Sequence, residues 1–412
     1  MDVLPCTAGA SIPTRQLAGG ISTDGGRNPI FRGIPGTKYF VSEKPFAAID
    51  SISGMSAAYR AALKSAFASV GTRQIPGLTD EIYAVVFDTD DTFFVSTHNA
   101  LYAISANGTR ALVCGDPASE PGFVDGTGNQ VRLNSPFRMM LFGDKKLVLS
   151  EPDNHALRMV FLETGTVKTI VGNGVAGVSV DVTNESAQLN CPTGICQNAD
   201  GLIYIADTLN HRIMILRIPD DWPNSEIHID VFCGVGLPGH VDGIYDISSF
   251  DGPIGLQIDH DSNLIVADEK NNCIRSVCEC CGFSKTITGK YADAVKFRDG
   301  PVESARFSSP VDVVVDDDNS ILVADRYNHC LRMIKSNGQK HEVVTLAGRR
   351  SVLIDDVLPL ELQSIDGLSK RARFNFPRHL CFNNSGQLVV VCNNNNGAIR
   401  VVSPRNSSFA PP

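Results

Sequence analysis

The sequence predicts an all-β fold, a six-bladed β-propeller of four-stranded antiparallel blades. Two observations lead to it. A motif with a proline and a preceding aspartate recurs five times, and four of the five repeats contain four short apolar runs separated by Asp, Asn and Gly turns. No repeat carries a ten-residue helical pattern. One small sheet cannot bury both of its faces, so neighbouring repeats are expected to stack, and radial stacking closes into a propeller.

The register of the repeat is strict. An aspartate stands eleven residues before each repeat proline, and four of the five aspartates are followed by glycine. The prolines are Pro136, Pro192, Pro253, Pro310 and Pro377, and the aspartates are Asp125, Asp181, Asp242, Asp299 and Asp366. A fixed spacing over five copies indicates that each copy is one structural unit.

A polar loop follows the second apolar run of every unit. In one unit the run Leu202-Ile-Tyr-Ile-Ala leads into Asp207-Thr-Leu-Asn-His211. This pattern resembles the NHL repeat, which is named for its Asn-His-Leu-type loop, and five such units span residues 133–404. The resemblance implies an NHL-type propeller, a fold that serves protein recognition, RNA binding on the Asn-His loop face and, in related enzymes, metal-dependent lyase or hydrolase chemistry.

A sixth unit precedes the five, with apolar runs at residues 84–88, 92–96, 100–104 and 110–115. The last unit stops after its third run, near Ser403. Residues 14–20 are predicted to supply the missing strand, because Arg15-Gln-Leu-Ala-Gly19 resembles Val344-Thr-Leu-Ala-Gly348. Pairing the N-terminus with the last blade would remove two exposed strand edges. Seven blades is the alternative.

The predicted organisation is a single propeller domain with an insertion. Residues 1–35 contain the closing strand and the first inter-blade link, and residues 36–80 form the insertion. Residues 81–412 hold the blades and make one domain with 14–35. The alanine-rich segment 56–70 predicts a helix with one apolar side.

Composition excludes several classes of function. Of 412 residues, 43% are hydrophobic and 20% charged, which is typical of a globular chain. No apolar run reaches the roughly 18 residues of a membrane span, and no secretory signal is recognisable. We therefore expect no membrane association and a cytoplasmic location. The net charge of −9 excludes a global basic surface for nucleic acid.

Twelve cysteines are expected to be buried free thiols of a reducing compartment. One group is denser: Cys273, Cys278, Cys280 and Cys281. It has no Cys-x-x-Cys spacing, so the first interpretation is packing at a strand end, and metal or redox chemistry is the alternative. No cofactor and no metal site is predicted.

The recurring loops supply the candidate binding residues. Histidine is a common metal ligand, but equivalent blades would spread these histidines around a ring, so a structural role in the turn is expected. The candidates on the loop face are His155, Asn210, His211, Arg212, Asn271, Arg326, Tyr327, His329 and Arg378. On the opposite face, Trp222 either anchors a partner or folds back over its own blade.

These observations favour a non-catalytic, monomeric scaffold that binds another protein. Single-stranded RNA on the loop face is the first alternative, although residues 76–412 carry 28 basic and 41 acidic residues, which opposes phosphate. A metal-dependent lyase or hydrolase is the second. The residues that follow the repeat prolines, at the expected channel, are mostly apolar with one aspartate, Asp312, and no catalytic residue is assigned.

Overall fold

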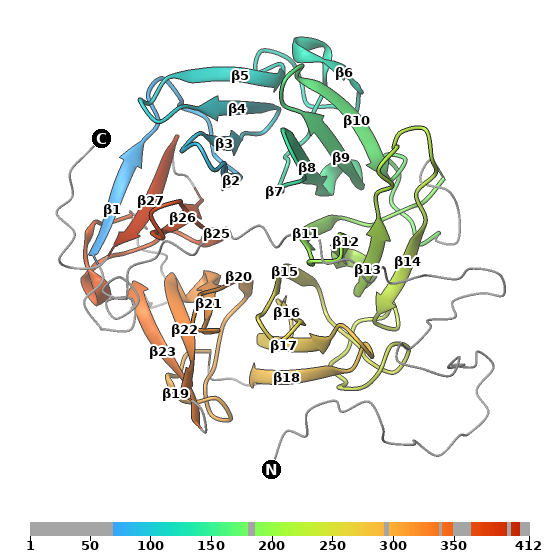
Figure 1. Cartoon of the computed structure of the whole chain (residues 1–412). Coiled ribbons are helices and arrows are strands. Elements are labelled where there is room, and N and C mark those ends of the chain that lie inside the picture. The colour runs from blue at the N-terminus through green and yellow to red at the C-terminus, as the bar shows by residue number, and fades with distance from the viewer. Residues whose placement is uncertain are drawn as a thin grey trace, which may run out of the picture. The chain divides into compact units, whose positions relative to one another are not determined.

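The computed structural model describes residues 69–179, 186–291, 296–337, 340–348, 364–393 and 397–403. All of them belong to the compact unit 48–412. Their strands form six antiparallel sheets arranged around a ring, so the predicted six-bladed propeller is confirmed and the seven-bladed alternative is wrong (Figure 1). The calls on residues 1–35, which include residues 14–20, lie outside the described residues.

Each blade begins with an inner strand and ends with an outer one. Blade 1 contains β2 (Ala84–Phe87), β3 (Phe93–Ser96), β4 (Ala100–Ile104) and β5 (Arg110–Gly115). Blade 2 contains β7 (Arg138–Leu141), β8 (Lys146–Glu151), β9 (Ala156–Phe161) and β10 (Thr166–Val171). Blade 3 contains β11 (Pro192–Gln197), β12 (Leu202–Asp207), β13 (Arg212–Arg217) and β14 (Ile229–Cys233).

The second half repeats this order. Blade 4 contains β15 (Pro253–Ile258), β16 (Asn263–Asp268), β17 (Cys273–Cys278) and β18 (Ser284–Gly289). Blade 5 contains β20 (Pro310–Val315), β21 (Ile321–Asp325), β22 (Cys330–Asn337) and β23 (Lys340–Gly348). Blade 6 contains β25 (Pro377–Phe382), β26 (Leu388–Cys392), β27 (Ala398–Ser403) and β1 (Ser69–Gln74).

The core consists of apolar clusters between neighbouring blades. Along β26, Leu388 and Val390 enter the cluster shared with blade 5, whereas Val389 and Val391 enter the cluster shared with blade 1. Successive side chains of a strand point to opposite faces, so a strand buried on both faces is apolar throughout. This explains the uninterrupted apolar runs that mark the second strand of every unit.

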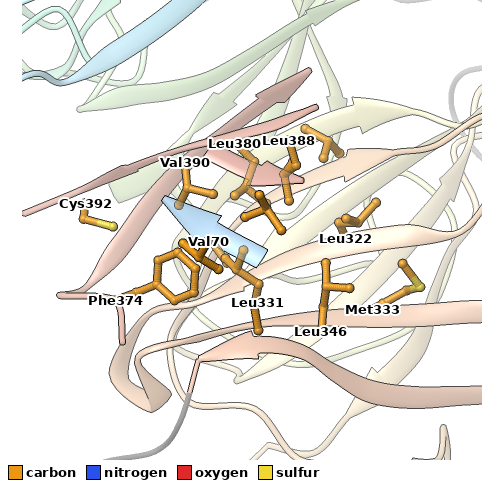
Figure 2. Close-up of a cluster of buried hydrophobic side chains, with 14 of the residues drawn as sticks. Val70, Leu322, Leu331, Met333, Leu346, Phe374, Leu380, Leu388, Val390 and Cys392 are labelled. Carbon is orange, nitrogen blue, oxygen red and sulfur yellow. The ribbon is translucent and has the colours of Figure 1, made fainter. Parts of the chain in front are cut away.

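The strand that closes the ring is β1. It pairs antiparallel with β27 over six residues, from Ser69 opposite Ser403 to Gln74 opposite Ala398. Val70 is 3% exposed and packs with Phe374, Leu331 and Val390 (Figure 2). An N-terminal segment therefore closes the last blade as predicted, but the prediction of residues 14–20 for this strand is wrong, since residues 69–74 occupy its position.

The predicted helix over residues 56–70 needs a correction at its end. Ser69 and Val70 begin β1, because pairing with the free edge of β27 satisfies their backbone groups and buries Val70. Residues 56–68 lie outside the described residues.

The Asp-Gly links protect the outer edges of several blades. The two-residue strands β6 (Gly126–Thr127), β19 (Gly300–Pro301) and β24 (Gly367–Leu368) pair with β10, β23 and β1 respectively. Each adds a short fifth strand, which shortens the edge open to another chain.

Candidate functional site

The recurring loop has the same backbone in four blades. In three of them a 3-10 turn follows the second strand: η2 (Pro152–Asn154), η3 (Thr208–Asn210) and η4 (Arg326–Asn328). The next residue adopts a left-handed conformation, with φ of 50° at His155, 53° at His211 and 54° at His329, and Asn272 has φ of 54° in blade 4. Asn and His are among the residues that tolerate this region, which accounts for their recurrence here.

The loop asparagines are structural. Asn210 donates to the carbonyl of Gly177 at 2.7 Å and to Asp207 Oδ2 at 2.8 Å, and Asn271 donates to Gly239 O and Asp268 Oδ2 at 2.8 Å each. Both side chains are buried. They tie each loop to the incoming inter-blade link, so these two predicted binding residues lie beneath the face and not on it.

The loop histidines connect neighbouring blades. The Nδ1 atoms of His155, His211 and His329 accept the backbone N–H of Cys191, Gly252 and Phe376, at 3.1, 3.2 and 3.4 Å. Each donor is the residue before the repeat proline of the next blade. Asn272 does the same in blade 4, where its Oδ1 accepts Ser309 N–H at 2.9 Å. An Nδ1 that accepts must be unprotonated, so these rings act as neutral inter-blade latches.

Acid should weaken these latches. Burial lowers the pKa of His329, and burial also lowers that of His211, partly opposed by Asp251. A folded-state pKa below the unfolded value gives stability that is present above pH 6.5 and lost as the pH falls. The His211→Asn/His329→Asn variant, which copies Asn272, is therefore expected to lose less stability than the wild type between pH 7.5 and 5 in urea unfolding.

Two controls define that experiment. His228→Asn alters an exposed histidine and should leave the pH profile unchanged. His329→Ala removes the acceptor and should cost about 1 kcal/mol at pH 7.5. Equal acid sensitivity of the asparagine variant and the wild type would contradict the latch.

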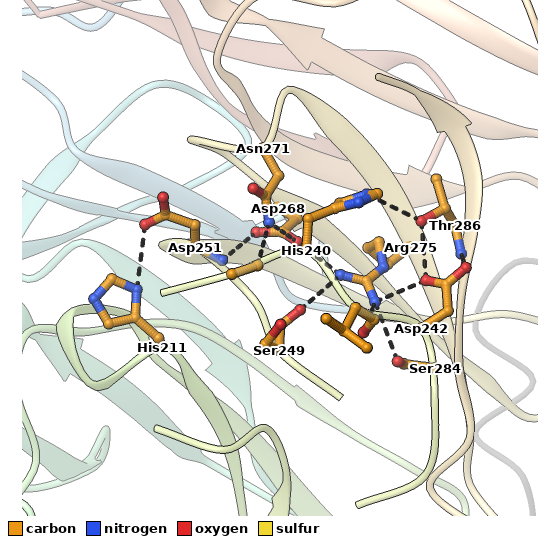
Figure 3. A network of polar contacts seen from close by, with 12 residues as sticks. His211, His240, Asp242, Ser249, Asp251, Asp268, Asn271, Arg275, Ser284 and Thr286 are labelled. Carbon is orange, nitrogen blue, oxygen red and sulfur yellow. Dashed lines mark hydrogen bonds and ion pairs between the residues drawn. The ribbon is translucent and has the colours of Figure 1, made fainter. Parts of the chain in front are cut away.

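In blades 2, 4 and 5 a buried arginine on the third strand joins the loop to its Asp-Gly link. In blade 4, Arg275 Nη1 lies 3.0 Å from Asp268 Oδ2, and its Nη2 lies 2.9 Å from Asp242 Oδ1 (Figure 3). Thr286 of the fourth strand donates to Asp242 through its N–H and its hydroxyl. Equivalent arginines in other blades are Arg158, Arg332 and Arg400. Burial raises the pKa of Asp268 and of Asp325 to about 6, although Arg275 and Arg332 oppose the shift.

This arginine was missed at the sequence level. The signal was present, because Arg158, Arg275 and Arg332 each stand 33 residues after the aspartate of their link. A buried carboxylate such as Asp268 requires a cation beside it, and the same arginine also reaches the exposed aspartate of the link.

The arginines predicted for the binding face differ in their exposure to solvent. Arg212 is buried and its Nε lies 2.8 Å from Asp207 Oδ2. Arg378 is also buried, with Nη1 3.1 Å from Glu81 Oε1. Arg326 is partly exposed and lies over the rings of Tyr327 and Phe376, and Tyr327 is 54% exposed. Only the Arg326–Tyr327 pair of these four residues is available to a partner.

Charged residues meet in the centre of the ring. Arg138 of blade 2 crosses to Asp312 of blade 5, with Nη2 3.3 Å from Oδ1. His379 of blade 6 places Nδ1 3.2 Å from Asp312 Oδ2 and Nε2 2.9 Å from the carbonyl of Val85. All three side chains are buried. Burial alone would raise the pKa of Asp312, but Arg138, His379 and the N–H of Leu380 hold it below its ordinary value.

The inner strands approach closely beside this triad. A Cβ on Gly194 would lie 1.9 Å from the carbonyl oxygen of Ile254, and one on Gly255 would lie 2.6 Å from Asp312 Cα. Both oxygens of Asp312 and both ring nitrogens of His379 are already engaged. The triad therefore ties four blades together.

Exposed apolar side chains gather around the loop of blade 3. Asn210 donates a hydrogen bond to Gly177 O, in the link that precedes blade 3. The carbonyl oxygen of Asn210 lies 3.8 Å from the position of a Cβ on Gly236, in the link that follows blade 3. The two links therefore flank this loop. The exposed fractions are 46% for Leu209, 57% for Val175, 64% for Val178, 43% for Val235 and 67% for Leu237. We call these five residues the Leu209 patch. Monomer surfaces seldom gather large apolar groups without a function.

Trp222 lies in the turn between β13 and β14 and is half-buried. Its ring stacks on Phe161 of blade 2, with centroids 6.4 Å apart and planes 2° from parallel. It packs against the apolar cluster between blades 2 and 3. Of the two interpretations, the geometry favours a ring that covers the junction between blades.

Comparison with known proteins agrees with this architecture. The NHL repeat model matches residues 189–216 and 307–332, which run from the link into the third strand of blades 3 and 5. Two of the repeats found in the sequence thus match the NHL repeat, which supports the resemblance of this six-bladed β-propeller to the NHL-repeat family.

Its relatives are longer proteins. NHL repeat-containing protein 2 of Bos taurus is 25% identical over 74% of this chain, and the match spans 43% of that protein. SUPPRESSOR OF QUENCHING 1 of Arabidopsis thaliana, a chloroplastic protein, is 27% identical over 69% of this chain and 26% of its own length. A solved protein of unknown function from Bacteroides thetaiotaomicron has a TM-score of 0.57 at 16% identity, covering 82% of this chain and 76% of that one.

Within the described ranges, no helix has the length and apolar character needed to cross a membrane.

Proposed function

We propose that this chain is a non-catalytic scaffold that binds another protein through the Leu209 patch. The exposure of five large apolar side chains on a rigid loop face supports the proposal. The loop beneath them is fixed by Asn210, Arg212 and His211, so little conformational entropy is lost when a partner binds. Residues 76–412 carry a net charge of −13, which favours a partner with an apolar centre and a basic rim.

The two alternatives have weaker support. RNA binding needs accessible cations, yet Arg212 and Arg378 are buried in ion pairs. A propeller lyase or hydrolase needs reactive groups that face a substrate, and Asp312 and His379 are engaged with each other, with Arg138 and with the backbone. The cytoplasmic location and the monomeric state stay predictions.

The test is affinity capture from a native extract, with and without RNase, followed by mass spectrometry and metal analysis of the bait. Leu209→Asp/Leu237→Asp is the test variant. Leu112→Asp, which places one aspartate at a leucine about as exposed as Leu209 on the outer edge of blade 1, is the control. We expect a partner that survives RNase, is retained by L112D and is lost by the double variant.

The captured partner would then be purified and titrated directly. Two aspartates in an apolar contact should weaken Kd at least tenfold, whereas L112D should leave it unchanged. A partner that the double variant retains, or that RNase removes, would contradict the proposal.

A further inference from the structure

Three cysteines converge at the turn between β17 and β18. Their sulfur atoms lie within 4.8 Å of one another, and Cys278 Sγ is 2.8 Å from Cys280 Sγ. Cys280 is exposed, and Cys278 and Cys281 are partly exposed. Cys273, at the other end of β17, is buried and separate from this group, so the predicted four-cysteine cluster divides into one packing thiol and a group of three. We call Cys278, Cys280 and Cys281 the thiol turn.

The backbone holds the thiol turn in place. Cys278 N–H donates to the carbonyl of Phe283 at 3.0 Å, and Gly282 N–H donates to the carbonyl of Cys278 at 2.8 Å. Gly282 has φ of 59°, which glycine adopts without strain. The turn thus positions its three sulfurs before any ligand arrives.

Glu279 lies between Cys278 and Cys280 in the sequence, but its side chain makes its hydrogen bonds with blade 3. The carboxylate of Glu279 accepts Asn198 Nδ2 at 3.1 Å and a hydrogen bond from the Tyr204 hydroxyl, both in blade 3. Among the described residues, the group of potential metal ligands consists of the three cysteines alone. A bound ion would therefore have three sulfur ligands and one position open to water or an external ligand.

The thiols and the backbone N–H groups of Cys280 and Cys281 are directed at the sulfur of Cys278. The thiolate is the metal-binding form of cysteine.

We propose that the thiol turn binds one thiophilic d10 cation, Zn²⁺ or Cu⁺, through Cys278, Cys280 and Cys281. Thiolates select such ions over Mg²⁺ or Ca²⁺. A Zn–S bond of about 2.3 Å sets tetrahedral sulfurs about 3.8 Å apart, so Cys280 Sγ must move away from Cys278 Sγ by about 1 Å. The exposed side chain of Cys280 can make this adjustment. The thiol turn connects β17 to β18 and shares no residue with the Leu209 patch, so the proposal does not depend on the proposed function.

The experiment uses the reduced full-length chain under anaerobic conditions, titrated separately with Zn²⁺ and Cu⁺ and then desalted for metal analysis. We expect one equivalent of at least one ion. Cys191→Ser, at a partly exposed cysteine outside the turn, is the control and should bind as the wild type does. The Cys278→Ser/Cys280→Ser/Cys281→Ser variant should bind less than about 0.2 equivalents, since no thiolate remains in the turn.

A second variant distinguishes loss of metal binding from misfolding. Cys280→Ser changes one exposed side chain, so it should melt as the wild type does and still weaken binding at least tenfold. Cobalt(II) provides a spectroscopic check, because a near-ultraviolet sulfur-to-cobalt band should appear in the wild type and vanish in the triple variant. Absence of binding by both ions, or equal binding by the folded triple variant, would overturn the proposal.

Discussion

Deletion of residues 1–74 is expected to destroy the monomeric propeller, whereas deletion of residues 1–68 should preserve it. The two truncations differ only by the strand β1. Removing β1 exposes the whole edge of β27 and leaves β24 without its partner. An open edge of this length is a template for pairing with another chain.

The energetic cost has two main parts. Val70 leaves an apolar cluster, which costs about 1.5–3 kcal/mol for a side chain of this size. Thr72 loses its two hydrogen bonds to Asp366, at 3.0 Å from its N–H and 2.7 Å from its hydroxyl. Each such bond contributes about 1 kcal/mol.

Size-exclusion chromatography with light scattering and thermal melting would measure the outcome. We expect the chain 75–412 to aggregate or to melt well below the chain 69–412. Equal melting temperatures and two monomers would show that blade 6 is stable with three strands and that β1 is dispensable.

The number of blades and the place of most strands could be predicted because they depend on local patterns. A spacing of eleven residues between Asp299 and Pro310, or between Asp366 and Pro377, reflects a link of constant geometry. The strands of blade 1 were found from apolar runs alone. Both signals depend on neighbouring residues, so no knowledge of distant contacts was needed.

The prediction of the closing strand was wrong because this strand is defined by its pairing with β27, at the other end of the chain. The alanine-rich segment favoured a helix up to Val70, and the ending Leu-Ala-Gly19 favoured residues 14–20. The discriminating residue is a threonine. Thr169, Thr286 and Thr345 of the fourth strands bind the link aspartates, and Thr72 binds Asp366 in the same way. In the alignment of residues 15–19 with 344–348, Gln16 takes the position of Thr345.

The candidate site was predicted in position but only partly in role. The loops that carry Asn210 and His211 were located correctly, yet the side chains point into the protein and hold it together. Such a role requires partners from other blades, for example Gly252 for His211 and Gly177 for Asn210. The triad of Arg138, Asp312 and His379 was missed for the same reason, because only ring closure brings blades 2, 5 and 6 together.

The largest effect of a single substitution is expected at Arg275. Its side chain is fully buried and contacts Asp268, Asp242, the carbonyls of Ser249 and Val241, and the hydroxyl of Ser284. Arg275→Leu would leave Asp268 buried without a cation. Loss of one partner from a buried pair costs about 3–5 kcal/mol, and we expect this decrease in the free energy of unfolding at pH 7.5.

The pH dependence identifies the cause of that loss. Asp268 has a pKa near 6 in the folded wild type, above the unfolded value of 3.8, so the folded state binds the proton more tightly and this group contributes less stability as the pH rises from 4 to 6. Without Arg275 the pKa of Asp268 should rise further. The pH range over which this group loses stability should then extend above pH 6. The variant should therefore be closer to the wild type at pH 5 than at pH 7.5.

Urea unfolding of both proteins at the two pH values would measure this difference. Arg217→Leu, at an exposed arginine that ends β13, is the matched control and should change stability by no more than about 0.5 kcal/mol. A loss below about 1 kcal/mol at Arg275, or a loss that is the same at both pH values, would mean that packing against Phe250 and not the buried charge accounts for the arginine. The expected result instead makes the contact of Arg275 with Asp268 and Asp242 the element that fixes the Asp-Gly link of blade 4, and thereby its loop, to the blade.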